Sequence, residues 1–137
     1  MHKILLIDDE EHILAAMAEY FTMLGYQVAS AANEVAALAL LDRERYRVVI
    51  TDLRLSSRNR FEGLEILEHV QRRHPETACV VLTAYGSAEI EQRARERGAR
   101  AFLQKPQPLD RVETVVAALV RRFAGATAAG APGRASV

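Results

Sequence analysis

Short apolar runs alternate along this chain with longer stretches in which apolar residues recur every three or four positions. Short continuous runs are typical of strands buried on both faces, and the longer spacing is typical of helices that bury one face. The pattern predicts strands at residues 3–7, 27–31, 47–51, 78–83 and 100–104. It predicts helices at residues 13–24, 35–41, 64–70, 88–94 and 109–123.

Five strands that are apolar on both faces predict a parallel sheet covered by helices on both sides. Right-handed crossovers would connect such strands, which gives an α/β, doubly wound (βα)5 domain of the flavodoxin-like type. Gly25 and Gly98 stand where two helices should end, and glycine supplies the positive φ that a C-terminal cap often needs. If the strand order is 2-1-3-4-5, the first and third strands are neighbours.

The composition changes after Phe123 to a small-residue sequence that contains glycine and proline and lacks large apolar side chains. Such a segment buries too little surface to offset the entropy lost on ordering. We expect a folded domain over residues 1–123 and a flexible tail or the start of a truncated linker over residues 124–137.

Composition and charge exclude several classes of protein. The chain has 137 residues, half of them hydrophobic, which suits one domain with a sizeable core. It lacks a stretch long enough to span a bilayer and lacks a signal-peptide pattern at its start, so we expect a cytoplasmic protein with no membrane contact. Eighteen basic residues balance eighteen acidic ones without a basic run, so direct binding to nucleic acid is not expected.

Candidate chemistry gathers at the predicted carboxyl ends of the strands, where doubly wound sheets bind ligands. Asp8 and Asp9 follow the first strand, and Asp52 follows the third. Thr83 closes the fourth strand, and Lys105 follows the fifth. Three converging carboxylates would raise one another's pKa unless a cation were present, and Mg²⁺ is the most suitable hard cation for oxygen ligands.

Each of these motifs also has an ordinary interpretation. The acidic run after the first strand could cap the next helix and complement its dipole. Asp52 alone suits a loop, Thr83 alone suits the end of a strand, and the pair of Lys105 and Pro106 alone suits a surface turn. The functional interpretation is favoured because the separate features fall at one end of one sheet.

Together these motifs make the chain similar to the receiver domains of two-component response regulators, with a fold like that of the chemotaxis receiver. The similarity runs from Lys3 to about Phe123. It depends on an acidic pair, a strand-end aspartate, a threonine-alanine pair and a lysine-proline pair in the family's order. The resemblance implies a phosphorylated signalling protein, and not an enzyme beyond self-phosphotransfer and self-dephosphorylation.

The resemblance implies that Asp52 is the phosphoacceptor, supplied by a histidine kinase or a phosphotransfer protein. It also implies that Asp9 and Asp52 bind Mg²⁺ through their carboxylates. Asp8 would act largely through water, and the backbone carbonyl of Arg54 would complete the protein ligands. The attack on phosphorus requires ionised Asp52, and the cations offset its repulsion from an anionic donor.

The resemblance further implies that Thr83 and Lys105 hold the phosphoryl oxygens and that Pro106 follows a cis peptide bond. Movement of Thr83 toward the phosphoryl group would open space for an aromatic side chain, and Phe102 stands where the family often has one. Phe102 also suits an ordinary core position. The surface of the fourth helix, the fifth strand and the fifth helix would then signal to a partner or output domain, or form a homodimer.

One loop departs from the family pattern. Ser56 stands where proline is expected, and the segment 56–62 has about three extra residues before Gly63. Arginines at positions 54, 58 and 60, in and just before this segment, could attract an anionic donor to the site. Alternatively, the loop could simply be solvated. Tyr85 is large enough to shield a phosphoryl group from water, which predicts slow self-dephosphorylation.

The sequence is also compatible with two alternative functions. The same fold could serve as a phosphorylation-independent interaction module, which the altered loop keeps possible. A phosphatase with an aspartate nucleophile is less consistent with the sequence, because such enzymes favour an Asp-x-Asp arrangement after the first strand, whereas Asp8 and Asp9 are adjacent.

Overall fold

The computed structural model of the chain describes residues 2–56 and 60–129. Its strands are β1 (Lys3–Ile7), β2 (Gln27–Ala31), β3 (Val48–Thr51), β4 (Ala78–Thr83) and β5 (Ala99–Gln104). Its helices are α1 (Glu11–Met23), α2 (Glu34–Arg43), α3 (Glu62–Arg73), α4 (Ala88–Glu96) and α5 (Leu109–Ala129). The predicted alternation of strand and helix is confirmed.

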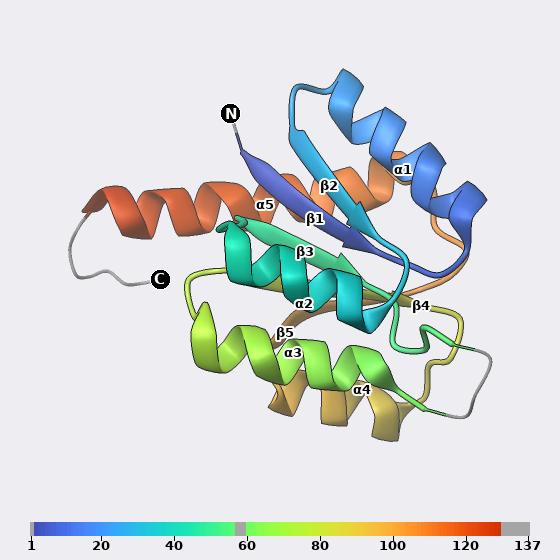
Figure 1. The fold of residues 1–137 in the computed structure, drawn as a ribbon. Helices are drawn as coiled ribbons and strands as arrows, with labels where there is room; N and C mark the ends of the chain where they lie inside the picture. The colour runs from blue at the N-terminus through green and yellow to red at the C-terminus, as the bar shows by residue number, and fades with distance from the viewer. Residues whose placement is uncertain (1, 57–59, 130–137) are drawn as a thin grey trace.

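All four strand pairings are parallel, and the sheet has the order β2-β1-β3-β4-β5, as predicted. One buried cluster packs the sheet against α2, α3 and α4, and a second packs the other face against α1 and α5 (Figure 1). Ile7 at the end of β1 is paired with Thr51 at the end of β3. The residues that follow these two strands therefore emerge side by side.

Two glycines end helices as predicted. Gly25 follows α1 with φ of 100°, and Gly98 follows α4 with φ of 102°. At the other end of two helices, Asn33 and Ser87 cap α2 and α4 by accepting hydrogen bonds from backbone amides. These local signals fix where the chain reverses between the helices and the sheet.

The last helix is longer than predicted, because α5 continues to Ala129 and not only to position 123. Residues 124–129 are rich in alanine, which has the highest helix propensity, and an existing helix grows without a second nucleation step. Residues 130–137 lie outside the described part of the chain, so the domain boundary and the tail stay predictions. Among the described helices, none is both long and apolar enough to cross a membrane.

Candidate functional site

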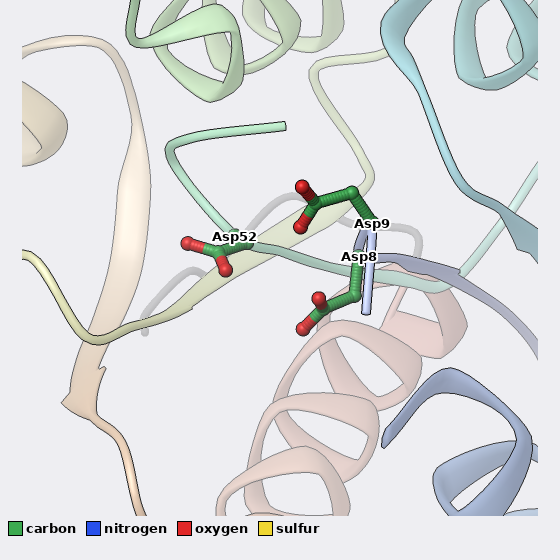
Figure 2. Close-up of side chains that lie close together, drawn as sticks. All are labelled: Asp8, Asp9 and Asp52. Carbon is green, nitrogen blue, oxygen red and sulfur yellow. The ribbon is translucent and has the colours of Figure 1, made fainter. Parts of the chain in front are cut away.

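Three aspartates meet at the carboxyl ends of β1 and β3, as the sequence predicts. Carboxylate oxygens of Asp8, Asp9 and Asp52 all lie within 4.8 Å of one another, and Figure 2 shows the three side chains gathered in one place. Asp8 and Asp52 are only 1% and 4% exposed, whereas Asp9 is exposed. The site therefore has a buried floor of negative charge with one carboxylate open to solvent.

The ammonium group of Lys105 bridges the two buried carboxylates. Lys105 Nζ donates hydrogen bonds to Asp8 Oδ2 at 2.7 Å and to Asp52 Oδ2 at 2.9 Å. Burial opposes the charge on Lys105, but its hydrogen bonds to Asp8 and Asp52 outweigh that effect and raise its pKa. Lys105 also contacts Glu10 Oε1 at 3.1 Å, a partner that the sequence did not predict.

The acidic run after β1 does not cap the following helix. Glu10 is the N-cap of α1, and its side chain makes no capping hydrogen bond. Asp8 Oδ1 instead accepts a hydrogen bond from the backbone amide of Glu10, which turns the chain and fixes the Asp8 side chain. Burial raises the pKa of the Asp8 carboxyl, although the hydrogen bonds from Lys105 and the Glu10 amide act in the opposite direction.

Hydrogen bonds to both carboxylate oxygens orient the Asp52 side chain. Its Oδ1 accepts a hydrogen bond from the Leu53 amide at 2.7 Å, while its Oδ2 faces Lys105. Its own amide donates to the Ile7 carbonyl at 3.0 Å, which ties the residue to the end of β1. The Asp52 side chain is thus held in one direction before any ligand binds.

Thr83 and Lys105 lie on adjacent strand ends, as expected. Thr83 is buried at the end of β4, and its carbonyl accepts a hydrogen bond from the Lys105 amide at 2.8 Å. Thr83 Oγ1 accepts a hydrogen bond from the Tyr85 amide at 3.2 Å. The peptide bond between Lys105 and Pro106 is cis, as the family resemblance implied.

The two predicted aromatic positions differ in environment. Phe102 is half-buried and packs against the core cluster beneath α2, α3 and α4. Tyr85 is 47% exposed, and the guanidinium carbon of Arg54 lies 4.1 Å from the centroid of its ring. This cation–π contact joins the loop after β3 to the loop after β4, next to Asp52.

Arg60, in the altered loop, pairs with glutamates on two helices. Arg60 pairs with Glu65 at 3.2 Å and lies 3.9 Å from Glu34, near the starts of α3 and α2. Position 58 lies outside the described residues. Whether Arg60 attracts an anionic donor to Asp52 therefore stays a prediction.

The start of α3 packs tightly beneath the site, a contact that no sequence pattern predicted. A Cβ atom on Gly63 would lie 2.3 Å from the Asp52 carbonyl oxygen, so only glycine fits there. Beside it, buried Glu62 accepts a hydrogen bond from the Leu55 amide at 3.1 Å. Burial opposes ionisation of Glu62, but hydrogen bonds from Ser56 and the Leu55 amide outweigh it and lower its pKa.

Comparison with known proteins agrees with this geometry. The family model of the response regulator receiver domain matches residues 4–117. The response regulator PilR of Pseudomonas aeruginosa is 35% identical over 87% of the chain, but the chain spans only 26% of that protein's length. The sporulation initiation phosphotransferase F of Bacillus subtilis is 32% identical, with 83% of this chain and 90% of that protein covered.

Solved structures show the same likeness. The CheY-like receiver domain protein of Methanospirillum hungatei superposes with a TM-score of 0.86 and 25% identity, covering 91% of this chain and 98% of that chain. A response regulator of Burkholderia pseudomallei, with 29% identity and a TM-score of 0.78, covers 96% of this chain and 74% of that chain. The family match, the strand order and the clustered aspartates lead to one conclusion: this chain belongs to the response regulator receiver domains of two-component systems.

Proposed function

We propose that Asp52 accepts a phosphoryl group from a histidine kinase or phosphotransfer protein in a Mg²⁺-dependent reaction. The observation that carries the proposal is the shared Lys105, whose ammonium contacts both Asp8 and Asp52 beside a third carboxylate. A buried carboxylate that is fixed by one amide and one ammonium is a positioned nucleophile. The Burkholderia relative was solved with a phosphorylated aspartic acid and a calcium ion, which supports this role by analogy.

The donor set fits a hard divalent cation. Three carboxylates with oxygens within 4.8 Å of one another repel unless a cation compensates them, and oxygen ligands are those that Mg²⁺ prefers. Asp9 and Asp52 would hold Mg²⁺ directly, Asp8 largely through water, and the Arg54 carbonyl would complete the set. When bound, Mg²⁺ would offset the negative charge that gathers between the donor and the site.

The chain's own residues would position and stabilise the transfer. A carboxylate oxygen of Asp52 forms the new O–P bond as the P–N bond of the donor phosphohistidine breaks, and the bonding pair returns to the imidazole nitrogen. Lys105 and the Thr83 hydroxyl would then bind phosphoryl oxygens. Because Lys105 already contacts Asp52, it needs only to exchange a carboxylate partner for a phosphoryl oxygen.

Phosphorylation would be transmitted through Thr83 and Phe102 to the face formed by α4, β5 and α5. The new phosphoryl group would draw the Thr83 hydroxyl toward it, and half-buried Phe102 would rotate into the space that Thr83 leaves. That face would then control a downstream partner or output domain, or a homodimer. This would make the chain a signalling protein whose own chemistry is limited to gaining and losing the phosphoryl group.

A phosphodonor assay tests the proposal. Purified chain is incubated with acetyl phosphate, with Mg²⁺ or with EDTA, and the phosphorylated fraction is measured by intact mass. We expect labelling of the wild type that requires Mg²⁺, and no labelling of Asp52→Asn. Equal labelling of both proteins would overturn the assignment of Asp52, and a well-folded wild type that takes no label would favour the phosphorylation-independent interaction module.

A further inference from the structure

The start of α3 holds the segment that follows β3 at two points. The Gly63 amide donates a hydrogen bond to the Leu53 carbonyl at 2.9 Å, and Glu62 accepts one from the Leu55 amide at 3.1 Å. Leu53 and Leu55 are 0% and 4% exposed, so their side chains also anchor this segment in the core. The backbone on both sides of Arg54 is therefore fixed by the fold.

The burial of Glu62 is not explained by the helix alone. Glu62 and Glu65 both stand in the first turn of α3, where negative charge complements the helix dipole. The Glu65 side chain does so while 57% exposed, whereas Glu62 is only 5% exposed. Burying a carboxylate costs free energy unless hydrogen bonds compensate it. Here the Leu55 amide and Ser56 supply those bonds and hold the Glu62 carboxylate inward.

The Leu55 amide belongs to the same peptide group as the Arg54 carbonyl. Within residues 2–56 and 60–129 the only cis peptide bond precedes Pro106, so this peptide is trans, and its N–H and C=O point in opposite directions. Because Glu62 fixes the direction of the N–H, it also fixes the direction of the carbonyl, away from Glu62. The hydrogen bond polarises the peptide group as well, which adds negative charge to the carbonyl oxygen.

We propose that Glu62 is a positioning residue that orients the Arg54 carbonyl toward Mg²⁺ through the peptide group that Arg54 shares with Leu55. The inference rests on the proposed function, in which this carbonyl completes the ligands supplied by the aspartates. Groups that hydrogen-bond to a metal ligand orient it and raise its basicity. The same segment already orients another ligand, because the Leu53 amide donates to Asp52 Oδ1 at 2.7 Å.

An HNCO spectrum of the whole chain labelled with ¹³C and ¹⁵N tests the proposal, because one cross-peak joins the Leu55 amide to the Arg54 carbonyl. In the metal-free protein, Glu62→Ala should move the Leu55 amide proton upfield, since the proton loses its acceptor. In the wild type, added Mg²⁺ should shift the Arg54 carbonyl carbon. The same titrations give the Mg²⁺ dissociation constant of each protein.

We expect Glu62→Ala to weaken Mg²⁺ binding about tenfold, as is typical when a group that supports a metal ligand is removed. Glu62→Gln can still accept the Leu55 hydrogen bond but carries no charge. A charged acceptor makes the bond about twice as strong, so this variant should lose half the free energy, or about threefold in affinity. The matched control is Glu68→Gln, which removes an exposed glutamate from the same helix and should bind Mg²⁺ as the wild type does.

Several results would overturn the role of Glu62. These are a Glu62 variant that binds Mg²⁺ like the wild type, a control that weakens binding as much as Glu62→Gln, or an Arg54 carbonyl signal that does not respond to Mg²⁺. If Glu62→Ala does not fold, Glu62→Gln decides the matter, because it keeps the size and the hydrogen-bond acceptor of the native side chain.

The proposed function and this inference can fail separately. A wild type that binds no Mg²⁺ would overturn both. A wild type that binds Mg²⁺ and is labelled at Asp52, while the Glu62 variants bind Mg²⁺ equally well, would overturn only the role of Glu62.

Discussion

The two ends of the sheet hold their charges in different ways. The chain has only two lysines, and each is in an ion pair: Lys105 at the carboxyl end and Lys3 at the amino end. Lys105 is 12% exposed and bridges buried aspartates, whereas Lys3 is 43% exposed and pairs with Glu44 at the surface. Both contacts pair a lysine with carboxylates, so burial, and not residue type, distinguishes the candidate functional site from a surface ion pair.

The balanced net charge conceals a separation of charge between these ends. Helices begin at the carboxyl end of the sheet and finish at the amino end, so acidic first turns and basic last turns collect at opposite ends. Arginines in the turns before β3 and around the start of β5 add to the basic end. The formal charge of zero that argued against a polyanion partner is therefore an average over two unlike surfaces.

The largest expected effect comes from Gly63→Ala, which tests whether the carboxyl end is as tightly packed as the geometry implies. The new Cβ would meet the Asp52 carbonyl oxygen, so we expect a loss of about 3 kcal/mol in the free energy of unfolding. Urea unfolding followed by circular dichroism measures it. At the amino end, Gly25→Ala meets no neighbouring atom and should cost about 1 kcal/mol for its positive φ. Equal losses would contradict the comparison.

Replacing each lysine with alanine compares the buried ion pairs at the carboxyl end with the exposed pair at the amino end. Lys105→Ala leaves buried Asp8 and Asp52 without their shared ammonium, and we expect a loss of about 2 kcal/mol when divalent cations are absent. Mg²⁺ should stabilise this variant more than the wild type, because the ion would replace the charge of the lost ammonium. Lys3→Ala should change stability little, as exposed ion pairs contribute little. Thermal unfolding with EDTA and with Mg²⁺ measures both, and similar losses for the two variants would disprove the distinction.

The strands and most residues of the candidate site could be predicted from sequence patterns. Continuous apolar runs predicted the strands. Because ligands bind at the carboxyl ends of such strands, the sequence also predicted that Asp8, Asp52 and Lys105 lie close together. Long-range packing could not be predicted in the same way. The contact of Gly63 with the Asp52 backbone depends on how α3 docks, and the pairing of Arg60 with Glu65 depends on a loop of unusual length.

The phosphorylated state offers a smaller test at the carboxyl end. Tyr85→Ala removes a ring that Arg54 holds beside Asp52, so water should reach the phosphoryl group more easily. We expect the lifetime of phosphorylated Asp52 to fall about fivefold, which corresponds to about 1 kcal/mol in activation free energy. The decay is followed by intact mass after the phosphodonor is removed. Tyr85→Phe keeps the ring and should decay like the wild type, and an unchanged lifetime in Tyr85→Ala would refute the shielding role.

The smallest effect concerns pH and the start of α2. Burial and the neighbouring Glu65 raise the pKa of Glu34 to about 7, and the hydrogen bond with Glu34 lowers the pKa of Glu65, so the shared proton resides on Glu34. The folded chain keeps this proton after the unfolded chain has lost it, so the Glu34 contribution to stability falls as pH rises from about 4.5 to 7.

Glu34→Gln should remove that pH dependence. Relative to the wild type, we expect a gain of less than about 1 kcal/mol at pH 8 and almost none near pH 4, because Glu65 is exposed and solvent screens the pair. Urea unfolding at the two pH values measures the difference. Glu76→Gln, an exposed glutamate at the amino end, is the control. A gain of equal size at both pH values would rule out the shared proton.

The most direct test of the central claim is to locate the phosphoryl group itself. The chain is phosphorylated with acetyl phosphate and Mg²⁺, the acyl phosphate is reduced with borohydride, and the modified residue is identified by peptide mass spectrometry. We expect modification at Asp52 and at neither Asp8 nor Asp9. Modification at Asp8 or Asp9 with Asp52 intact would contradict it.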